Sequence, residues 1–110
     1  MPHIDALLPL YPDAAGRHAM LQEALAQVRA DLSAMGMAVG AGDYPLARQL
    51  THRAKGTVCF LGTADMPQAF DVLTDALRAR DPARIGTAYA PVKQSLLELE
   101  HILLQRLRTI

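Results

Sequence analysis

The regular spacing of apolar residues constrains the fold of this chain more than any other feature. Apolar positions recur at intervals of four and three in a segment that follows Arg17: Leu21, Leu25, Val28, Leu32 and Met35. The same rhythm returns near the C-terminus: Ile85, Tyr89, Val92, Leu96, Leu99 and Leu103. This spacing places each set on one face of a helix that packs against other helices. We therefore predict an all-α fold.

Prolines, glycines and aspartates divide this pattern into separate helices. Three prolines limit residues 1–16 to a lead-in with at most a short helical turn that begins near Ile4. The first long helix begins near Arg17 and ends in the glycine-rich segment 36–42. Three later helix starts combine an N-capping aspartate with a proline in the first turn: Asp43 with Pro45, Asp65 with Pro67, and Asp81 with Pro82.

The later helices also have predicted faces and ends. The helix after Asp43 has an inward stripe that runs to a stop at Gly62: Leu46, Leu50, Ala54, Val58 and Leu61. The next helix reaches about Arg80, and the last stays in phase across Pro91, which favours one long kinked helix. Short connections favour neighbours that run up and down. The prediction is an antiparallel up-and-down four-helix bundle in residues 17–110, after the lead-in.

Composition excludes several classes of function. Eleven basic residues balance eleven acidic ones, so no net field attracts nucleic acid or an anionic membrane surface. The single cysteine, Cys59, cannot form an internal disulfide, which suits a reducing compartment. Charged residues break every apolar run well short of the roughly 18 residues that a membrane span needs. We expect a cytoplasmic monomer without direct membrane contact.

The segment from His52 to Gly62 carries the candidate chemistry. His52, Lys55, Gly56 and Cys59 share the helix face opposite the apolar stripe, so His52 is expected to point into solvent with Lys55 one turn away. An exposed imidazole is mostly neutral at pH 7, and the neutral ring has a lone pair that can attack phosphorus. The ammonium of Lys55 would then stabilise the charge on the phosphoryl oxygens.

Gly56 is unusual because it lies in a helix interior on the exposed face. Glycine there costs about 0.8 to 1 kcal/mol relative to alanine, so its presence calls for a reason. A bare backbone beside His52 would allow a partner to bring its own active-site loops close to the helix. We therefore assign Gly56 to docking clearance.

These residues resemble the signature of histidine-containing phosphotransfer (HPt) domains of two-component phosphorelays. The resemblance depends on the run His52-x-x-Lys55-Gly56, on Gly62 ten residues after the histidine, and on Gly42-Asp43 before it. It covers some 85 to 90 residues from Arg17 onward. It implies a bundle in which His52 takes a phosphoryl group from a receiver-domain aspartate and passes it to another.

The resemblance also implies the partners and the absence of other activities. The partners would be response-regulator receiver domains and a hybrid histidine kinase, and magnesium would belong to the receiver. No cofactor, autokinase activity or nucleotide-binding site is expected, and no nucleotide-binding glycine pattern is present. The docking surface is expected on the helix of residues 44–62 and the helix before it. Four residues are assigned to partner binding: Arg48, Thr51, Cys59 and Thr74.

The chain departs from the family pattern, and other readings stay open. Thr74 stands where many members place Gln or Glu near the histidine ring. His52 could be an ordinary exposed histidine, and Gly56 could allow tight helix packing instead of docking. A helical adaptor that binds a receiver or kinase without carrying phosphate is the main alternative. Glu98-x-x-His101 has the spacing of a di-iron ligand pair but lacks the second such pair that a metal site needs.

Overall fold

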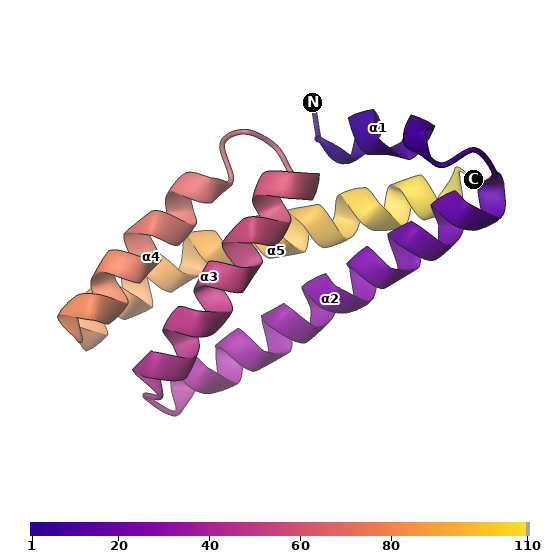
Figure 1. The fold of residues 1–110 in the computed structure, drawn as a ribbon. Helices are drawn as coiled ribbons and strands as arrows, with labels where there is room; N and C mark the ends of the chain where they lie inside the picture. Colours follow the sequence, from indigo (N-terminus) through magenta and orange to yellow (C-terminus); the bar gives the residue numbers. More distant parts are fainter. Residues whose placement is uncertain (110) are drawn as a thin grey trace.

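The structure is a computed structural model, and it describes residues 1–109. Those residues form helices joined by short turns and contain no strand, so the predicted all-α class is confirmed (Figure 1). Ile110, the last residue of the predicted domain, lies outside the described residues. The elements in chain order are α1 (Ile4–Leu7), η1 (Leu8–Leu10), α2 (Ala14–Gly40), α3 (Tyr44–Leu61), α4 (Pro67–Ala79) and α5 (Pro82–Arg108).

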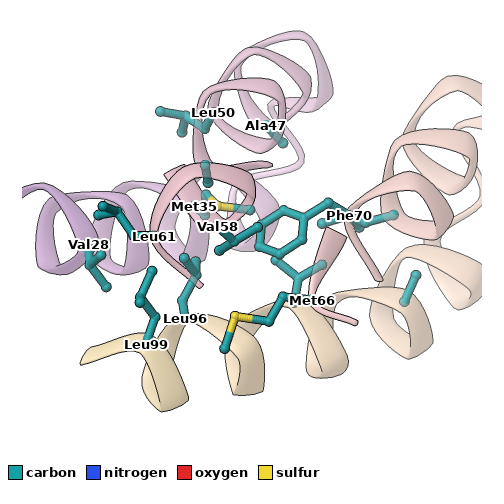
Figure 2. Packing of buried hydrophobic residues seen from close by; sticks show 14 of the residues in the cluster. Val28, Met35, Ala47, Leu50, Val58, Leu61, Met66, Phe70, Leu96 and Leu99 are labelled. Atoms are coloured by element: carbon teal, nitrogen blue, oxygen red, sulfur yellow. The ribbon is translucent and has the colours of Figure 1, made fainter. Parts of the chain in front are cut away.

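The long helices pack around one apolar core. α2 contacts α3 and α5, and α4 contacts the same two helices, as Figure 1 shows. In the core, the Phe70 ring of α4 points toward Val58 of α3, with Met66 beside it and Leu96 of α5 near by (Figure 2). Phe70 is fully buried, and burial of such a side chain contributes roughly 1.5 to 3 kcal/mol. This core holds α3 between α2 and α4.

Two of the three predicted aspartate caps are confirmed. The Asp43 carboxylate accepts the Leu46 backbone N–H at 3.3 Å, and Asp81 accepts two backbone N–H groups in the first turn of α5. Asp65 does not cap α4, because its carboxylate accepts the hydroxyl of Thr63 instead. The residue before Pro67 is Met66, which has no side-chain hydrogen bond and packs into the core.

The ends of the helices differ slightly from expectation. α2 begins at Ala14 rather than near Arg17, because Asp13 caps its first turn through the backbone N–H of Gly16 at 2.6 Å. It ends at Gly40, inside the glycine-rich segment. α5 runs unbroken across Pro91, as expected for one long helix. Pro91 is exposed.

The lead-in packs against the rest of the chain. Ile4 is fully buried in the core, and the backbone N–H of His3 donates to the Gly62 carbonyl at 2.8 Å. Asp5 accepts two hydrogen bonds from the Arg106 guanidinium, at 2.6 and 2.9 Å. These bonds lower the pKa of Asp5 below its usual value. Residues 1–16 therefore belong to the same packed unit as the helices that follow.

The inward face of α3 is rotated from the predicted stripe at its first turn. Leu46 is 42% exposed, whereas Ala47 is fully buried. Each spacing of four residues advances about 40° around a helix of 3.6 residues per turn. A stripe of such spacings that faces the core at Val58 has therefore rotated away from the core at Leu46, in the first turn. On α5, Tyr89 is only half-buried, whereas Ala88 beside it is buried.

Candidate functional site

His52 is exposed on the outer side of α3, as the sequence predicts. Its position follows from the helix itself, because the core side of α3 is set by Leu50, Ala54 and Val58, which are all buried. Both Lys55 and Gly56 lie within the next turn. The ring is therefore open to solvent, as both the phosphotransfer interpretation and an ordinary exposed histidine require.

A hollow of about 650 Å³ lies beside His52, between α3 and α4. We call it the His52 hollow, and its walls include Arg48, His52 and Lys55 from α3 with Asp71, Thr74, Asp75 and Arg78 from α4. His52 and Lys55 thus face the same space. The hollow brings an imidazole together with several charged groups at one open surface.

Lys55 makes an ion pair across the His52 hollow. Its ammonium nitrogen Nζ lies 2.6 Å from Oδ1 of Asp71, and the two side chains are 38% and 60% exposed. The hydrogen bond to Asp71 raises the pKa of Lys55 above its usual value, so the ammonium is charged at neutral pH. The lysine that accompanies His52 is therefore held by a carboxylate of the neighbouring helix.

Gly56 faces open space. A Cβ atom built on its backbone would meet no atom within 4 Å, so tight helix packing does not explain this glycine. Gly56 lines a second hollow of about 490 Å³, between α2 and α3, which we call the Phe60 hollow. Phe60 lies on its wall with 64% of its surface exposed, and Met20 of α2 lines the same hollow. The exposed side of α3 that carries His52, Gly56 and Phe60 therefore separates the two hollows, and we call it the α3 ridge.

Gly62 serves a different purpose from Gly56. A Cβ atom there would lie 2.9 Å from the backbone oxygen of Val58 and 2.5 Å from the sulfur of Met66. Gly62 is buried where α3 ends, so a side chain would have to displace its neighbours. Its role is structural, as expected for a helix stop.

The four residues assigned to partner binding differ in location and exposure. Arg48 and Thr74 line the His52 hollow, and Cys59 is exposed outside both hollows. Thr51 is fully buried, and its hydroxyl donates to the Ala47 carbonyl at 2.6 Å. The assignment of Thr51 to a contact surface is therefore wrong, because its position in the helix places it next to Leu50 on the core side.

Thr74 does not orient the histidine ring as a donor. Its hydroxyl donates to the Phe70 carbonyl one turn earlier in α4, at 2.9 Å. A threonine hydroxyl has a single proton, so this bond uses its only donor. Thr74 stands where Gln or Glu is common in the family, and with its only proton donated to Phe70 it supplies no hydroxyl proton to His52.

The sequence interpretation missed the charged residues of the α4 wall. It placed the docking surface on α3 and the helix before it, whereas the His52 hollow opens toward α4. A signal was present, because Asp71, Thr74, Asp75 and Arg78 recur at helical spacing on one face. That face is polar, and only the packing of α4 against α3 places it beside His52.

Metal sites and membrane spans are the other features that bear on the function of residues 1–109. These residues contain no group of three or more His, Cys, Asp and Glu side chains that could hold a metal ion, and both Glu98 and His101 are exposed. No helix in this part of the chain is both long enough and apolar enough to cross a membrane. Comparisons with protein-family models, with curated proteins and with solved structures found no match. The function of this chain must therefore be inferred from the residues of the site.

Proposed function

We propose that this chain is an HPt-like phosphocarrier that accepts a phosphoryl group on His52 from a receiver-domain aspartyl phosphate and passes it to another receiver aspartate. One observation carries the proposal: an exposed imidazole shares a hollow with a charged ammonium, next to backbone that has no side chain. The pairwise packing of α2 to α5 with short connections supports the expected antiparallel up-and-down four-helix bundle.

The bonds that change in the transfer step involve only the imidazole and the partner's aspartyl phosphate. The lone pair of one ring nitrogen of His52 forms the N–P bond, while the P–O bond to the partner's aspartate breaks. The electron pair of that bond stays on the leaving carboxylate. The other ring nitrogen keeps its proton, so the ring becomes positive until that proton passes to water. Onward transfer to a second receiver reverses these steps.

Lys55 contributes charge at the place where the phosphoryl oxygens arrive. Asp71 occupies one donor direction of its ammonium, and an ammonium has three N–H donors. The remaining donors can bind phosphoryl oxygens without breaking the ion pair. Because the group in transit carries negative charge on three oxygens, a nearby cation stabilises the transition state.

The ridge of α3 is the proposed docking surface for the receiver. Gly56 lets the partner's loops approach the backbone, and the exposed ring of Phe60 with Met20 offers apolar contact on the α2 side. Arg48 extends the surface along α3 on the other side of His52. The partners we propose are receiver domains and a hybrid histidine kinase. The proposal includes a cytoplasmic monomer that has no kinase activity of its own.

The test of this function is phosphoryl acceptance by His52. The purified chain is incubated with a phosphorylated receiver domain, and its intact mass and acid-labile phosphate are measured. His52→Gln is expected to abolish acceptance with unchanged helicity. His101→Gln removes another exposed histidine, on α5, and is expected to accept normally. Acceptance by His52→Gln would refute the assignment, and receiver binding without any phosphate gain in the wild type would favour the adaptor alternative.

Lys55→Ala separates charge stabilisation from docking. We expect slower phosphoryl transfer with unchanged receiver affinity, because the ammonium faces the His52 hollow and the docking surface lies along the α3 ridge. Transfer is measured by single-turnover mixing with the phosphorylated receiver, and affinity by titration with the unphosphorylated one. An unchanged rate would remove the electrostatic role of Lys55.

A further inference from the structure

The ion pair between Lys55 and Asp71 crosses from α3 to α4, and the phosphoryl chemistry proposed above leaves Asp71 unexplained. A carboxylate on the wall of a hollow that must admit a phosphoryl group is unexpected, because like charges repel. Yet the Asp71 oxygen lies 2.6 Å from the ammonium that is to stabilise this group. Asp71 therefore has two opposing effects: its charge repels the phosphoryl group, and its contact with Lys55 positions the ammonium.

Positioning of the ammonium is the larger effect. A lysine side chain is a flexible four-carbon stem, and an exposed one samples many rotamers unless a partner holds it. Asp71 selects the rotamers in which Nζ reaches across the His52 hollow. The repulsion is weakened, because 60% of the Asp71 side chain is exposed and water and salt screen its charge.

We propose that Asp71 is a positioning residue that holds the Lys55 ammonium at the edge of the His52 hollow, ready for the incoming phosphoryl group. Asp71 acts through Lys55 and makes no contact with the reacting atoms. This inference rests on the proposed phosphotransfer function of His52. It also gives a reason for an aspartate on the polar face of α4, one turn before Thr74.

The test compares transfer rates of variants at Asp71 with a charge-matched control. Asp71→Asn keeps the size of the side chain and removes its charge, and we expect transfer to His52 to slow roughly two- to fivefold, the factor that an exposed ion pair supplies. Asp71→Glu keeps the carboxylate and is expected to restore most of the rate. Asp75→Asn removes one negative charge from the same wall, and among residues 1–109 Asp75 makes no ion pair. Its rate should be no lower than that of the wild type.

A double variant shows whether Asp71 acts through the lysine. If Asp71 only positions the ammonium, Lys55→Ala and Lys55→Ala/Asp71→Asn transfer at the same rate. A purely structural role for Asp71 would instead slow the double variant further and lower its melting temperature. Thermal denaturation of each variant checks that the fold is intact.

The outcomes separate this inference from the function on which it rests. Normal acceptance by the wild type with equal or faster transfer by Asp71→Asn would overturn the positioning role and leave phosphotransfer standing. Equal slowing by Asp71→Asn and Asp75→Asn would also overturn it, since the loss of rate would then not depend on the ion pair with Lys55. Failure of the wild type to accept a phosphoryl group would overturn both.

Discussion

Gly56 provides a prediction in which stability and function change in opposite directions. Replacement by alanine adds a Cβ atom that would meet no atom within 4 Å, so neither a clash nor new packing contributes to the change in the free energy of unfolding. What remains is the backbone preference, and alanine in a helix interior is about 0.8 to 1 kcal/mol more favourable than glycine. We expect Gly56→Ala to raise the free energy of unfolding by about this amount.

Thermal unfolding followed by circular dichroism at 222 nm measures the change. For a domain of this size, about 1 kcal/mol corresponds to an upward shift of the melting temperature of roughly 4 °C. Gly86 is the matched control, because it also lies in a helix, is exposed and has no atom within 4 Å of a built Cβ. Gly86→Ala should therefore stabilise the protein to a similar extent.

The two glycines should differ in partner binding. Gly56→Leu places a large side chain on the α3 ridge beside His52, and we expect weaker affinity for a receiver domain despite a more stable helix. Gly86→Leu lies on α5 and should leave that affinity unchanged. Affinity is measured by titration with a receiver domain. Undiminished affinity of Gly56→Leu would refute the clearance argument, and loss of stability in Gly56→Ala would refute the claim that this glycine faces open space.

Three further outcomes test the ion pairs and close contacts that hold the fold together. Arg53→Ala removes the half-exposed guanidinium that donates to the buried carboxylate of Asp31, to which Gln27 still donates, and we expect the free energy of unfolding to fall by about 1 to 3 kcal/mol in urea denaturation. Gly62→Ala should destabilise by roughly 1 to 3 kcal/mol in the same assay, because its Cβ would overlap the backbone of the preceding turn. Asp5 has a pKa below its usual 3.8 in the folded state, so its pair with Arg106 contributes stability above that pH and loses it as the pH falls through the folded-state pKa. Asp5→Asn should therefore lower stability at neutral pH and flatten its dependence on pH below 3.8, and equal acid sensitivity of both proteins would contradict this.

The class of fold and the outward position of His52 could be predicted from the sequence. Apolar spacing, aspartate caps and prolines act mainly within one helix, so most of their effects depend little on the rest of the molecule, although Asp65 and Leu46 are exceptions. That is why the bounds of α3, the start of α5 and the exposure of His52 agree with expectation. The drift of a four-residue spacing could also have been calculated, but only the packing decides that Leu46, and not Val58 nearer the other end of the stripe, lies outside the core.

Only the tertiary structure decided what surrounds His52. Spacing along α4 shows that Asp71 and Arg78 share a face, but not that this face meets α3 at the turn that carries Lys55. The rotation of each helix about its own axis depends on the packing of the whole core. Side chains from several helices fill that core jointly, so the sequence of one helix does not fix its rotation. The sequence by itself determined a helical chain with an exposed histidine, whereas the packing of α4 against α3 determined the ion pair that holds the lysine beside it.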